Sequence, residues 1–326
     1  MTGSGVAVII VNWNSEQDLN KCLDALKCQT IAPSRVIVLD NGSIDFDAQS
    51  WKKRHPMVEF HPLTKNLGFA AASNMGASIA SDCQWLAFLN PDAFPEPDWL
   101  EVLIKASKSN PEFNFFAGLM VSALQPNIID GTGEVYHSCG WAWRRDHLSE
   151  LSDRVMKKEE VFGACGGAAF VSRRAFMYAG GFDESYFCYF EDIDLSFRLR
   201  LLGGRCLFIP EARVRHVGNG ATTKWSDFAV YHGHRNLVFT YLKNMPSFLF
   251  WYYFPQHVLL NIFSIFWCAR RGQGGIAVKA KWDAIRRLST IWKVRKSIQK
   301  RKTVSTASVA KILTRGFTRH PYLKTF

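Results

Sequence analysis

The chain has 326 residues, which is long enough for one large α/β domain and a smaller appendage. A hydrophobic content of 48% with a charged content of 21% excludes a disordered chain. The eight cysteines are scattered without metal-ligand spacing, so we expect reduced thiols in a cytosolic protein and no disulfide framework.

Positive charge is concentrated at the C-terminal end. From Arg270 onward the chain holds 16 of its 40 basic residues and one of its 28 acidic residues, Asp283. The preceding part therefore holds 24 basic and 27 acidic residues and is nearly neutral. This split predicts a neutral body with a basic appendage that meets an anionic partner, either a membrane leaflet or nucleic acid.

Strand and helix patterns alternate in the N-terminal third. Val6–Val11 is a β-branched run typical of a strand buried on both faces, and Val36–Leu39 and Trp85–Leu89 are expected to be further strands. A capping pattern at Ser15 starts one helix, and a second is expected over Ala70–Ala80. This alternation predicts an α/β fold with a doubly wound, mostly parallel sheet.

Each of these strands is followed by polar residues, namely Asn12, Asp40 and Asp92. Ligands of doubly wound sheets bind at the carboxyl ends of the strands, so the coincidence indicates a nucleotide site. A dinucleotide-binding fingerprint is missing, because Gly3 and Gly5 precede the first strand and do not follow it.

The second half of the chain begins with a mixed pattern. A glycine-rich segment, Gly163–Gly167, leads into a strand expected at Ala168–Val171. The acidic run Glu191–Asp194 then starts a helix that ends at a pair of glycines. Asp194 and Arg198 are four residues apart on this helix, which predicts a structural ion pair.

Several separated motifs resemble those of the family 2 glycosyltransferases, which have the GT-A fold, and most closely their rhamnosyltransferase-like branch. The motifs are Asp40–Ser43, Asn66–Phe69, Asn74, Asn90–Asp92 and Gly180–Arg198. They occur in the family's order, within a resemblance that runs from about Val6 to Asn244. The resemblance implies a Rossmann-like nucleotide-sugar half over residues 1–110 and an acceptor half over residues 111–244. A C-terminal helical region would cover residues 245–326.

The resemblance also implies a divalent metal, Mg²⁺ or Mn²⁺, that stabilises the departing diphosphate. Asp92 is the expected main ligand because it matches the family's Asp-X-Asp motif, and His216 is an expected second ligand. Asn90 stands in place of the first aspartate, which leaves the strictness of the metal requirement open. Read alone, Asn90–Asp92 is a common turn sequence and His216 a structural histidine.

Donor-nucleotide contacts are assigned by the same resemblance. Asp40 matches the position that binds the pyrimidine base, and Gly68 would let the backbone approach the donor closely. Read alone, Asp40–Gly42 is a turn and Gly68 a loop glycine. The expected donor-binding residues are Asn12, Asp40, Asn41, Asn66, Gly68, Asn74, Asn90 and Asp92.

The acidic run is expected to supply the catalytic groups. An inverting transfer needs one carboxylate to accept the proton of the acceptor hydroxyl as its oxygen attacks. The resemblance assigns this base to Asp192, and Glu191 is expected to orient the acceptor. The start of a helix would favour the ionised form of Asp192, although an aspartate there can also be a simple N-cap. Arg235 and Asn236 are candidates for a phosphate contact.

The C-terminal region has a membrane-binding pattern. Phe248–Ala269 comprises 22 residues without Asp, Glu, Lys or Arg, enough to span a bilayer, but Pro255 and Asn261 are costly in hydrocarbon. A basic amphipathic helix follows, so we expect residues 248–302 to lie in the plane of an anionic membrane surface. A single membrane span and a packed helical subdomain are the alternatives, and no nucleic acid is expected as a partner.

These features predict an inverting glycosyltransferase that moves a sugar from a nucleotide-diphosphate donor to a polyprenyl diphosphate-linked saccharide. The resemblance implies dTDP-L-rhamnose as donor, in cell-surface polysaccharide synthesis such as that of O-antigen. The enzyme would be peripheral or monotopic at the cytoplasmic face of a bacterial inner membrane. One alternative is the same fold using a UDP-hexose or UDP-N-acetylhexosamine. The other is a non-catalytic membrane scaffold of a glycan-assembly complex.

Overall fold

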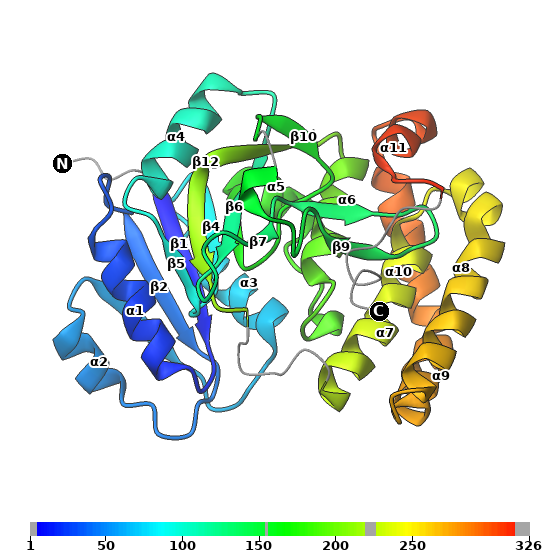
Figure 1. The fold of residues 1–326 in the computed structure, drawn as a ribbon, viewed down its shortest axis with the longest axis horizontal. Helices are drawn as coiled ribbons and strands as arrows, with labels where there is room; N and C mark the ends of the chain where they lie inside the picture. Colours follow the sequence, from blue (N-terminus) through cyan, green and yellow to red (C-terminus); the bar gives the residue numbers. More distant parts are fainter. Residues whose placement is uncertain (1–4, 154–155, 219–225, 317–326) are drawn as a thin grey trace.

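The computed structural model describes residues 5–153, 156–218 and 226–316 (Figure 1). A mixed ten-stranded sheet runs through it in the order β10-β12-β6-β11-β4-β1-β2-β3, with β5 paired to β12 and β7 to β6. Strands β8 and β9 form a separate hairpin. The strands are β1 (Val6–Asn12), β2 (Arg35–Asp40), β3 (Val58–Pro62), β4 (Trp85–Leu89), β5 (Ala93–Pro95), β6 (Phe115–Ser122), β7 (Ile129–Gly131), β8 (Glu134–Tyr136), β9 (Ala142–Arg144), β10 (Glu159–Val161), β11 (Ala168–Ser172) and β12 (Cys206–His216).

Helices cover both faces of this sheet. One apolar core joins it to α1 (Glu16–Lys27), α2 (Ala48–Arg54) and α4 (Trp99–Ser109). A second core, on the other face, includes residues of α3 (Phe69–Ile79), α5 (Arg173–Ala179) and α6 (Glu191–Leu201). Strand β1 is apolar along its length because both of its faces are buried. The doubly wound α/β fold is therefore confirmed.

Strand β11 interrupts the parallel arrangement of the sheet. Strands β1 to β4 are parallel, whereas β11 runs antiparallel to both β4 and β6. Strand β12 is parallel to β6, and its last residues pair with β5 so that His216 lies opposite Ala93. This pairing brings the end of β12 to the end of β4, where the candidate site lies.

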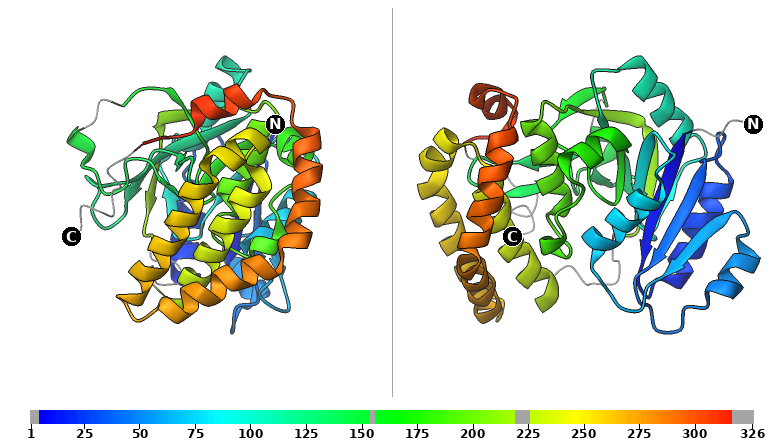
Figure 2. Two further views of the ribbon diagram at one scale, coloured as in Figure 1. Left: turned by 90° about the vertical axis from the view of Figure 1, so that its right-hand side faces the viewer. Right: turned by 180° about the vertical axis from the view of Figure 1, so that it is seen from behind.

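A layer of C-terminal helices packs at the end of the molecule away from α1 and α2 (Figures 1 and 2). The layer consists of α7 (Asp227–Asn244), α8 (Ser247–Ala269), α9 (Gly274–Arg286), α10 (Leu288–Arg301) and α11 (Thr306–Ile312). A third apolar core joins these helices to α6. In the part of the chain that the structure describes, no helix is long and apolar enough to cross a membrane.

The expected strands and helices are present with small shifts at their ends, and several further elements, β3 and β6 among them, were not anticipated. Two expectations were wrong in detail. The Ser15 side chain makes no capping hydrogen bond, although α1 starts directly after it. The basic helix expected after Ala269 is two helices, α9 and α10, which meet at Arg287. Residues 317–326 of the C-terminal region lie outside the described residues.

Candidate active site

The carboxyl ends of β1 and β2 carry the first pair of candidate donor-binding residues. Asn12 and Asp40 are partners in the parallel ladder and are almost completely buried. The Asn12 amide donates to Asp40 Oδ1 at 2.8 Å, and the Ser43 backbone N–H donates to Asp40 Oδ2 at 3.1 Å. The two residues predicted to meet at this sheet edge do so. Their contact with a nucleotide stays a prediction.

The next two donor-binding candidates join the neighbouring loops. Asn41 Nδ2 donates to Asn66 Oδ1 at 2.9 Å, and Asn41 Oδ1 accepts from the Leu67 backbone N–H at 2.8 Å. Gly68 has a φ of 85°, and a Cβ added to it would lie 2.6 Å from the Phe187 carbonyl oxygen. Position 68 therefore requires glycine because Phe187 lies so close to it, and this holds whether or not Gly68 also faces the donor.

Asn74 has a structural contact. Its Nδ2 donates to the Phe182 carbonyl at 2.9 Å, and its Oδ1 accepts from the Phe182 backbone N–H at 2.9 Å. Both ends of the amide thus tie α3 to the segment that precedes α6. The donor contact expected for Asn74 would have to compete with these bonds.

The two expected metal ligands lie side by side. His216 Nε2 is 3.3 Å from Asp92 Oδ1, and Asn90 Nδ2 is 3.5 Å from the same nitrogen. The other ring nitrogen, Nδ1, is 2.8 Å from Oδ2 of Asp130. Asp130 also pairs with Arg144. The result is a buried carboxylate–imidazole–carboxylate chain at the ends of β4 and β12.

The hydrogen bonds within this carboxylate–imidazole–carboxylate chain shift the pKa values of His216 and Asp92 toward their charged forms. Burial alone would lower the pKa of His216, but its hydrogen bonds to Asp130 and Asp92 raise it. Burial alone would raise the pKa of Asp92, yet the His216 hydrogen bond lowers it. A carboxylate oxygen suits Mg²⁺ or Mn²⁺, an imidazole nitrogen beside it suits a transition metal ion, and metal-binding histidines usually hold a carboxylate with their other nitrogen. The residues present therefore fit a divalent metal.

Asp192 lies at the start of α6, as expected. Its Oδ2 accepts from the Gly166 backbone N–H at 2.8 Å, and its Oδ1 from the Ile193 backbone N–H at 2.8 Å. The next glycine, Gly167, approaches Asn90 so closely that an added Cβ would lie 3.1 Å from the Asn90 amide nitrogen. The glycine-rich loop thus connects the candidate base to the end of β4.

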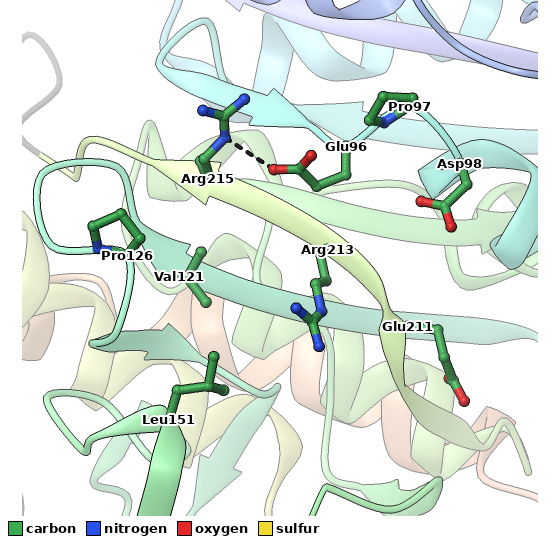
Figure 3. Close-up of a pocket in the computed structure, with 9 residues that line it drawn as sticks. All are labelled: Glu96, Pro97, Asp98, Val121, Pro126, Leu151, Glu211, Arg213 and Arg215. Carbon is green, nitrogen blue, oxygen red and sulfur yellow. Dashed lines mark ion pairs between the residues drawn. The ribbon is translucent and has the colours of Figure 1, made fainter.

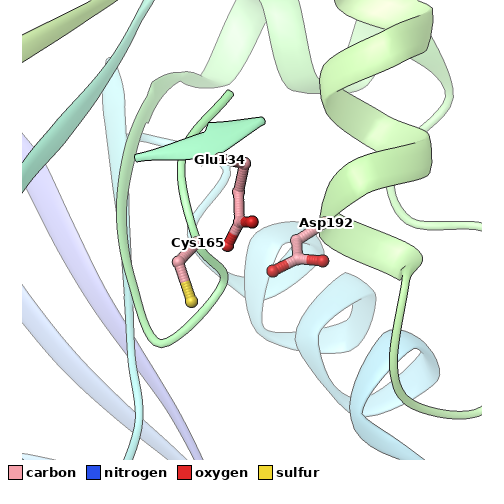
Figure 4. Close-up of side chains that lie close together, drawn as sticks. All are labelled: Glu134, Cys165 and Asp192. Atoms are coloured by element: carbon pink, nitrogen blue, oxygen red, sulfur yellow. The ribbon is translucent and has the colours of Figure 1, made fainter. Parts of the chain in front are cut away.

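Two further ionisable groups lie beside Asp192. Figure 4 shows the side chains of Glu134, Cys165 and Asp192 facing one another, and their ligand-type atoms lie within 4.8 Å. Burial, and then the Asp192 charge, raise the pKa of Glu134 to about 8. Burial also raises the pKa of the Cys165 thiol. A carboxyl group with a raised pKa beside the Asp192 carboxylate can exchange a proton with it, so this cluster suits acid–base chemistry.

Glu191 is more enclosed than its expected role suggests. Its side chain is buried, and Oε2 has no hydrogen-bond partner among the described residues. Burial, and then the charge of Asp192, raise the pKa of Glu191 well above the usual value. A contact with the acceptor stays a prediction for this residue.

Arg235 and Asn236 make structural contacts, and the phosphate contact considered for them stays a prediction. Both side chains are buried. The Arg235 guanidinium donates to the carbonyls of Ser185 and Tyr186, each at 3.0 Å. Helix α7 therefore uses these two residues to hold the loop that leads into α6.

The buried Glu134 carboxyl makes folding pH-dependent. In the unfolded chain this glutamate loses its proton near 4.5, and in the folded protein near 8. Between these values the unfolded state binds fewer protons, so the free energy of unfolding falls as pH rises. We expect Glu134→Gln to flatten the fall in melting temperature from pH 5 to 8. The exposed Glu112→Gln is the control, and equal slopes in both variants would contradict this assignment.

A pocket lies away from these residues. It has a volume of about 630 Å³ and lies between β12, the end of β5 and the turn after β6 (Figure 3). An ion pair between Arg215 and Glu96 borders it. Its lining residues are Glu96, Pro97, Asp98, Val121, Pro126, Leu151, Glu211, Arg213 and Arg215, which include none of the expected site residues.

Asp130 and Glu134 were not anticipated from the sequence. They lie at either end of the segment Asp130-Gly-Thr-Gly-Glu134, with Asp130 inside β7 and Glu134 at the start of β8. Two acids around a glycine turn are a weak signal, because such segments are common surface turns. Only the fold shows that one acid contacts the expected metal ligand and the other the expected base.

Polar groups at the ends of parallel strands, an acid–imidazole pair and a carboxylate fixed at a helix start are the features that the family motifs predicted for this part of the molecule. The family model described as "Glycosyl transferase family 2" matches residues 7–178. The chain belongs to glycosyl transferase family 2, as the motifs predicted.

Two proteins of Mycobacterium tuberculosis are among the relatives of known function. N-acetylglucosaminyl-diphospho-decaprenol L-rhamnosyltransferase is 30% identical over 237 residues, which cover 64% of this chain and 75% of that protein. Pre-mycofactocin glycosyltransferase is 28% identical over 231 residues, which cover 70% of this chain and 46% of that protein. The likeness to the rhamnosyltransferase-like branch is confirmed by the first.

Solved structures confirm the GT-A fold. GalNAc-T7, crystallised with UDP, GalNAc and Mn²⁺, superposes with a TM-score of 0.58 at 18% identity over 72% of this chain. Staphylococcus aureus TarS has a TM-score of 0.50 at 16% identity over 73% of this chain. The chain spans less than half of each of these proteins, 47% and 40% respectively. At these identities the likeness concerns the fold alone.

Proposed function

We propose that this protein is a metal-assisted, inverting glycosyltransferase that moves a sugar from a nucleotide-diphosphate donor to a polyprenyl diphosphate-linked saccharide. The observation that carries the proposal is the Asp192 carboxylate. Two backbone N–H groups orient it at the start of α6, in a chain of family 2. A carboxylate held in this way meets the requirement for a general base.

The reaction follows from that placement. Asp192 accepts the proton of the acceptor hydroxyl while the hydroxyl oxygen bonds to the anomeric carbon of the donor sugar. The bond from that carbon to the diphosphate breaks on the opposite face, and the nucleoside diphosphate leaves. Asp192 therefore acts without a covalent intermediate, and the anomeric configuration is inverted.

Asp92 and His216 would hold the divalent metal, Mg²⁺ or Mn²⁺. When bound, such an ion neutralises the charge that develops on the diphosphate. Asp130 holds the His216 ring by its other nitrogen, which fixes the tautomer and orientation of the ring. With Asn90 at the first motif position, His216 supplies the second ligand that the motif lacks.

The substrates are proposed from the relatives. The relative acting on N-acetylglucosaminyl-diphospho-decaprenol supports L-rhamnose from dTDP-L-rhamnose as the sugar and a lipid-linked acceptor. Within the chain, we propose donor binding by residues 1–110, acceptor binding by 111–244 and membrane contact by 245–326. The donor-side residues are those at the ends of β1, β2 and β4.

The outer face of α8 supports membrane contact. We name its exposed large apolar residues the α8 stripe, and they lie three, four or seven residues apart on one face, with Pro255 and Gln256 exposed between its two parts. The stripe comprises Phe248, Trp251, Tyr252, Val258, Leu259, Ile262, Phe263 and Phe266. The opposite face, with Phe250 and Tyr253, is buried against the other helices. Because the opposite face of α8 is already packed against the protein, an exposed apolar stripe of this length favours insertion into a lipid interface.

Basic residues close to the α8 stripe indicate that it would bind lipids of negative charge. Arg270 and Arg271 follow α8 directly, and Lys279 and Arg286 lie on α9 beside the exposed Trp282. Aromatic and basic side chains together favour an anionic membrane surface. We therefore propose that residues 248–302 lie on the cytoplasmic face of a bacterial inner membrane, where a lipid-linked acceptor is within reach.

The test is a transfer assay with purified protein, Mn²⁺ and N-acetylglucosaminyl-diphospho-polyprenol. dTDP-L-rhamnose, UDP-hexoses and UDP-N-acetylhexosamines are compared by the nucleotide released and the lipid product formed. We expect product with dTDP-L-rhamnose, loss of product with a chelator, and recovery on addition of Mn²⁺ or Mg²⁺. Product with a UDP-sugar alone would replace the donor assignment.

The second candidate is a non-catalytic membrane scaffold. The asparagine at position 90, in place of the first motif aspartate, favours it. Background turnover with every donor, from protein that still binds vesicles, would support the scaffold.

A further inference from the structure

The loop between Tyr186 and α6 has a strained backbone. Phe187 has φ 65° and ψ −65°, and Tyr189 and Phe190 have φ of 65° and 70°. The Cys188 N–H donates to the Tyr186 carbonyl at 2.8 Å, which closes a tight turn around Phe187. Three bulky residues in the left-handed region persist only where the surroundings hold them there. Asp192 follows this loop by two residues.

One side chain contacts most of the loop carbonyls. Asn236, on α7, is completely buried, and its Nδ2 lies near three loop oxygens. These are the carbonyls of Tyr186 at 3.0 Å, Cys188 at 2.9 Å and Tyr189 at 2.7 Å. Asn236 Oδ1 accepts in turn from Arg235 Nε at 3.0 Å. Both ends of the amide are therefore engaged, and its orientation is fixed.

The same loop contacts the donor side of the site. The Phe187 carbonyl accepts from the Ala70 backbone N–H at 3.2 Å, at the start of α3. A side chain at Gly68 would collide with Phe187. The loop thus connects the proposed donor-binding segment with the helix that bears the base, and Asn236 holds it from behind.

We propose that Asn236 is a positioning residue for sugar transfer, which acts by fixing the loop over residues 186–190 and so the placement of Asp192 relative to the donor. The proposal rests on the proposed function for its catalytic consequence. The Asn236 side chain is buried, and it hydrogen-bonds to the loop and to Arg235. A displacement of about 1 Å between reacting groups can cost about 100-fold in rate, so a small shift of the loop is sufficient.

Helix α7 provides a matched control. Asn244 is also completely buried, and its Nδ2 donates to Asp194 on α6 at 2.8 Å. Both asparagines therefore link α7 to the same region by a buried amide, but only Asn236 contacts the loop carbonyls. Asn236→Ala and Asn244→Ala should cost comparable stability and differ in their effect on the reaction.

The experiment compares the two variants in full-length protein by transfer kinetics and by hydrogen exchange. We expect Asn236→Ala to lower kcat about tenfold or more with little change in donor KM, and Asn244→Ala to keep kcat within about twofold, per folded protein. Amide exchange over residues 186–192 should accelerate in Asn236→Ala alone. Asn236→Ser, which keeps one donor, should fall between the wild type and Asn236→Ala.

Two results would overturn the proposal. One is equal kcat per folded molecule in Asn236→Ala and Asn244→Ala. The other is loss of folding in both Asn236 variants, which would assign the residue to the fold alone. If the wild type transfers no sugar, the proposed function fails, and hydrogen exchange over the loop still decides whether Asn236 holds it.

Discussion

Replacement of Asp192 by asparagine is expected to lower kcat for sugar transfer by about 10³-fold to 10⁴-fold, near the upper range for loss of a general base. Asparagine keeps the shape of the side chain and one oxygen that can accept the Gly166 or Ile193 N–H. It cannot accept the proton of an acceptor hydroxyl. Donor KM should change little, because the residue acts on the acceptor. Initial rates at saturating donor measure the effect.

The matched control for this substitution is Asp98→Asn. Asp98 precedes α4 and lines the pocket of Figure 3, away from the candidate site. We expect wild-type rates from it. Wild-type rates from Asp192→Asn would remove Asp192 from the mechanism, and lost activity in Asp98→Asn would direct attention to that pocket.

Replacement of Leu259 by glutamate is expected to weaken binding to anionic vesicles by about 100-fold. Leu259 lies in the middle of the α8 stripe and is 66% exposed. Burying a leucine side chain in an apolar environment contributes about 1.5–3 kcal/mol, and a carboxylate adds repulsion from anionic lipid. Co-sedimentation with phosphatidylglycerol vesicles, over a range of lipid concentrations, gives the partition coefficient.

Leu124 provides the control. It is 70% exposed, in the turn between β6 and β7, so Leu124→Glu makes the same change on another surface. We expect wild-type vesicle binding from Leu124→Glu. Equal losses in both variants, or none in either, would contradict membrane contact through α8. If Leu259→Glu instead turned a dimer into a monomer, the α8 stripe would be an interface between two copies.

Near the proposed base Asp192, the buried Asp194 carboxylate pairs with one residue of its own helix and one of a distant helix. The pairing of Asp194 with Arg198 was predicted from their spacing and is confirmed, at 2.8 Å. The same carboxylate also accepts from Lys243 on α7 at 2.9 Å, which no local pattern indicated. Asp194 is completely buried, so it needs more than one partner. The second partner could come only from another helix.

Local information in the sequence was sufficient for the fold class and for the strand ends. Period-two and period-3.6 patterns, with polar residues after each buried strand, depend on residues close together in the chain. Asn12, Asp40 and Asp92 could therefore be assigned to one sheet edge from these patterns alone. The family motifs also placed Asp192 at the start of a helix, where it lies.

Other features depended on chain segments that are far apart in the sequence. Asp130 of β7 contacts His216 at the end of β12, and Glu134 at the start of β8 has a carboxylate oxygen within 4.8 Å of one of Asp192 on α6. Asn236, which the sequence offered only as a candidate for a phosphate contact, holds a strained loop. Burial and pairing with distant partners decide such roles, and neither can be calculated from spacing along the chain.

The sequence by itself determined the family, the α/β architecture, the candidate base and the basic, aromatic character of the C-terminal region, because each is encoded by residues near one another. The tertiary structure alone decided which side chains surround that base and which face of α8 is exposed. The physical reason is that desolvation, hydrogen-bond satisfaction and surface exposure are properties of packed neighbours, which a linear pattern does not specify.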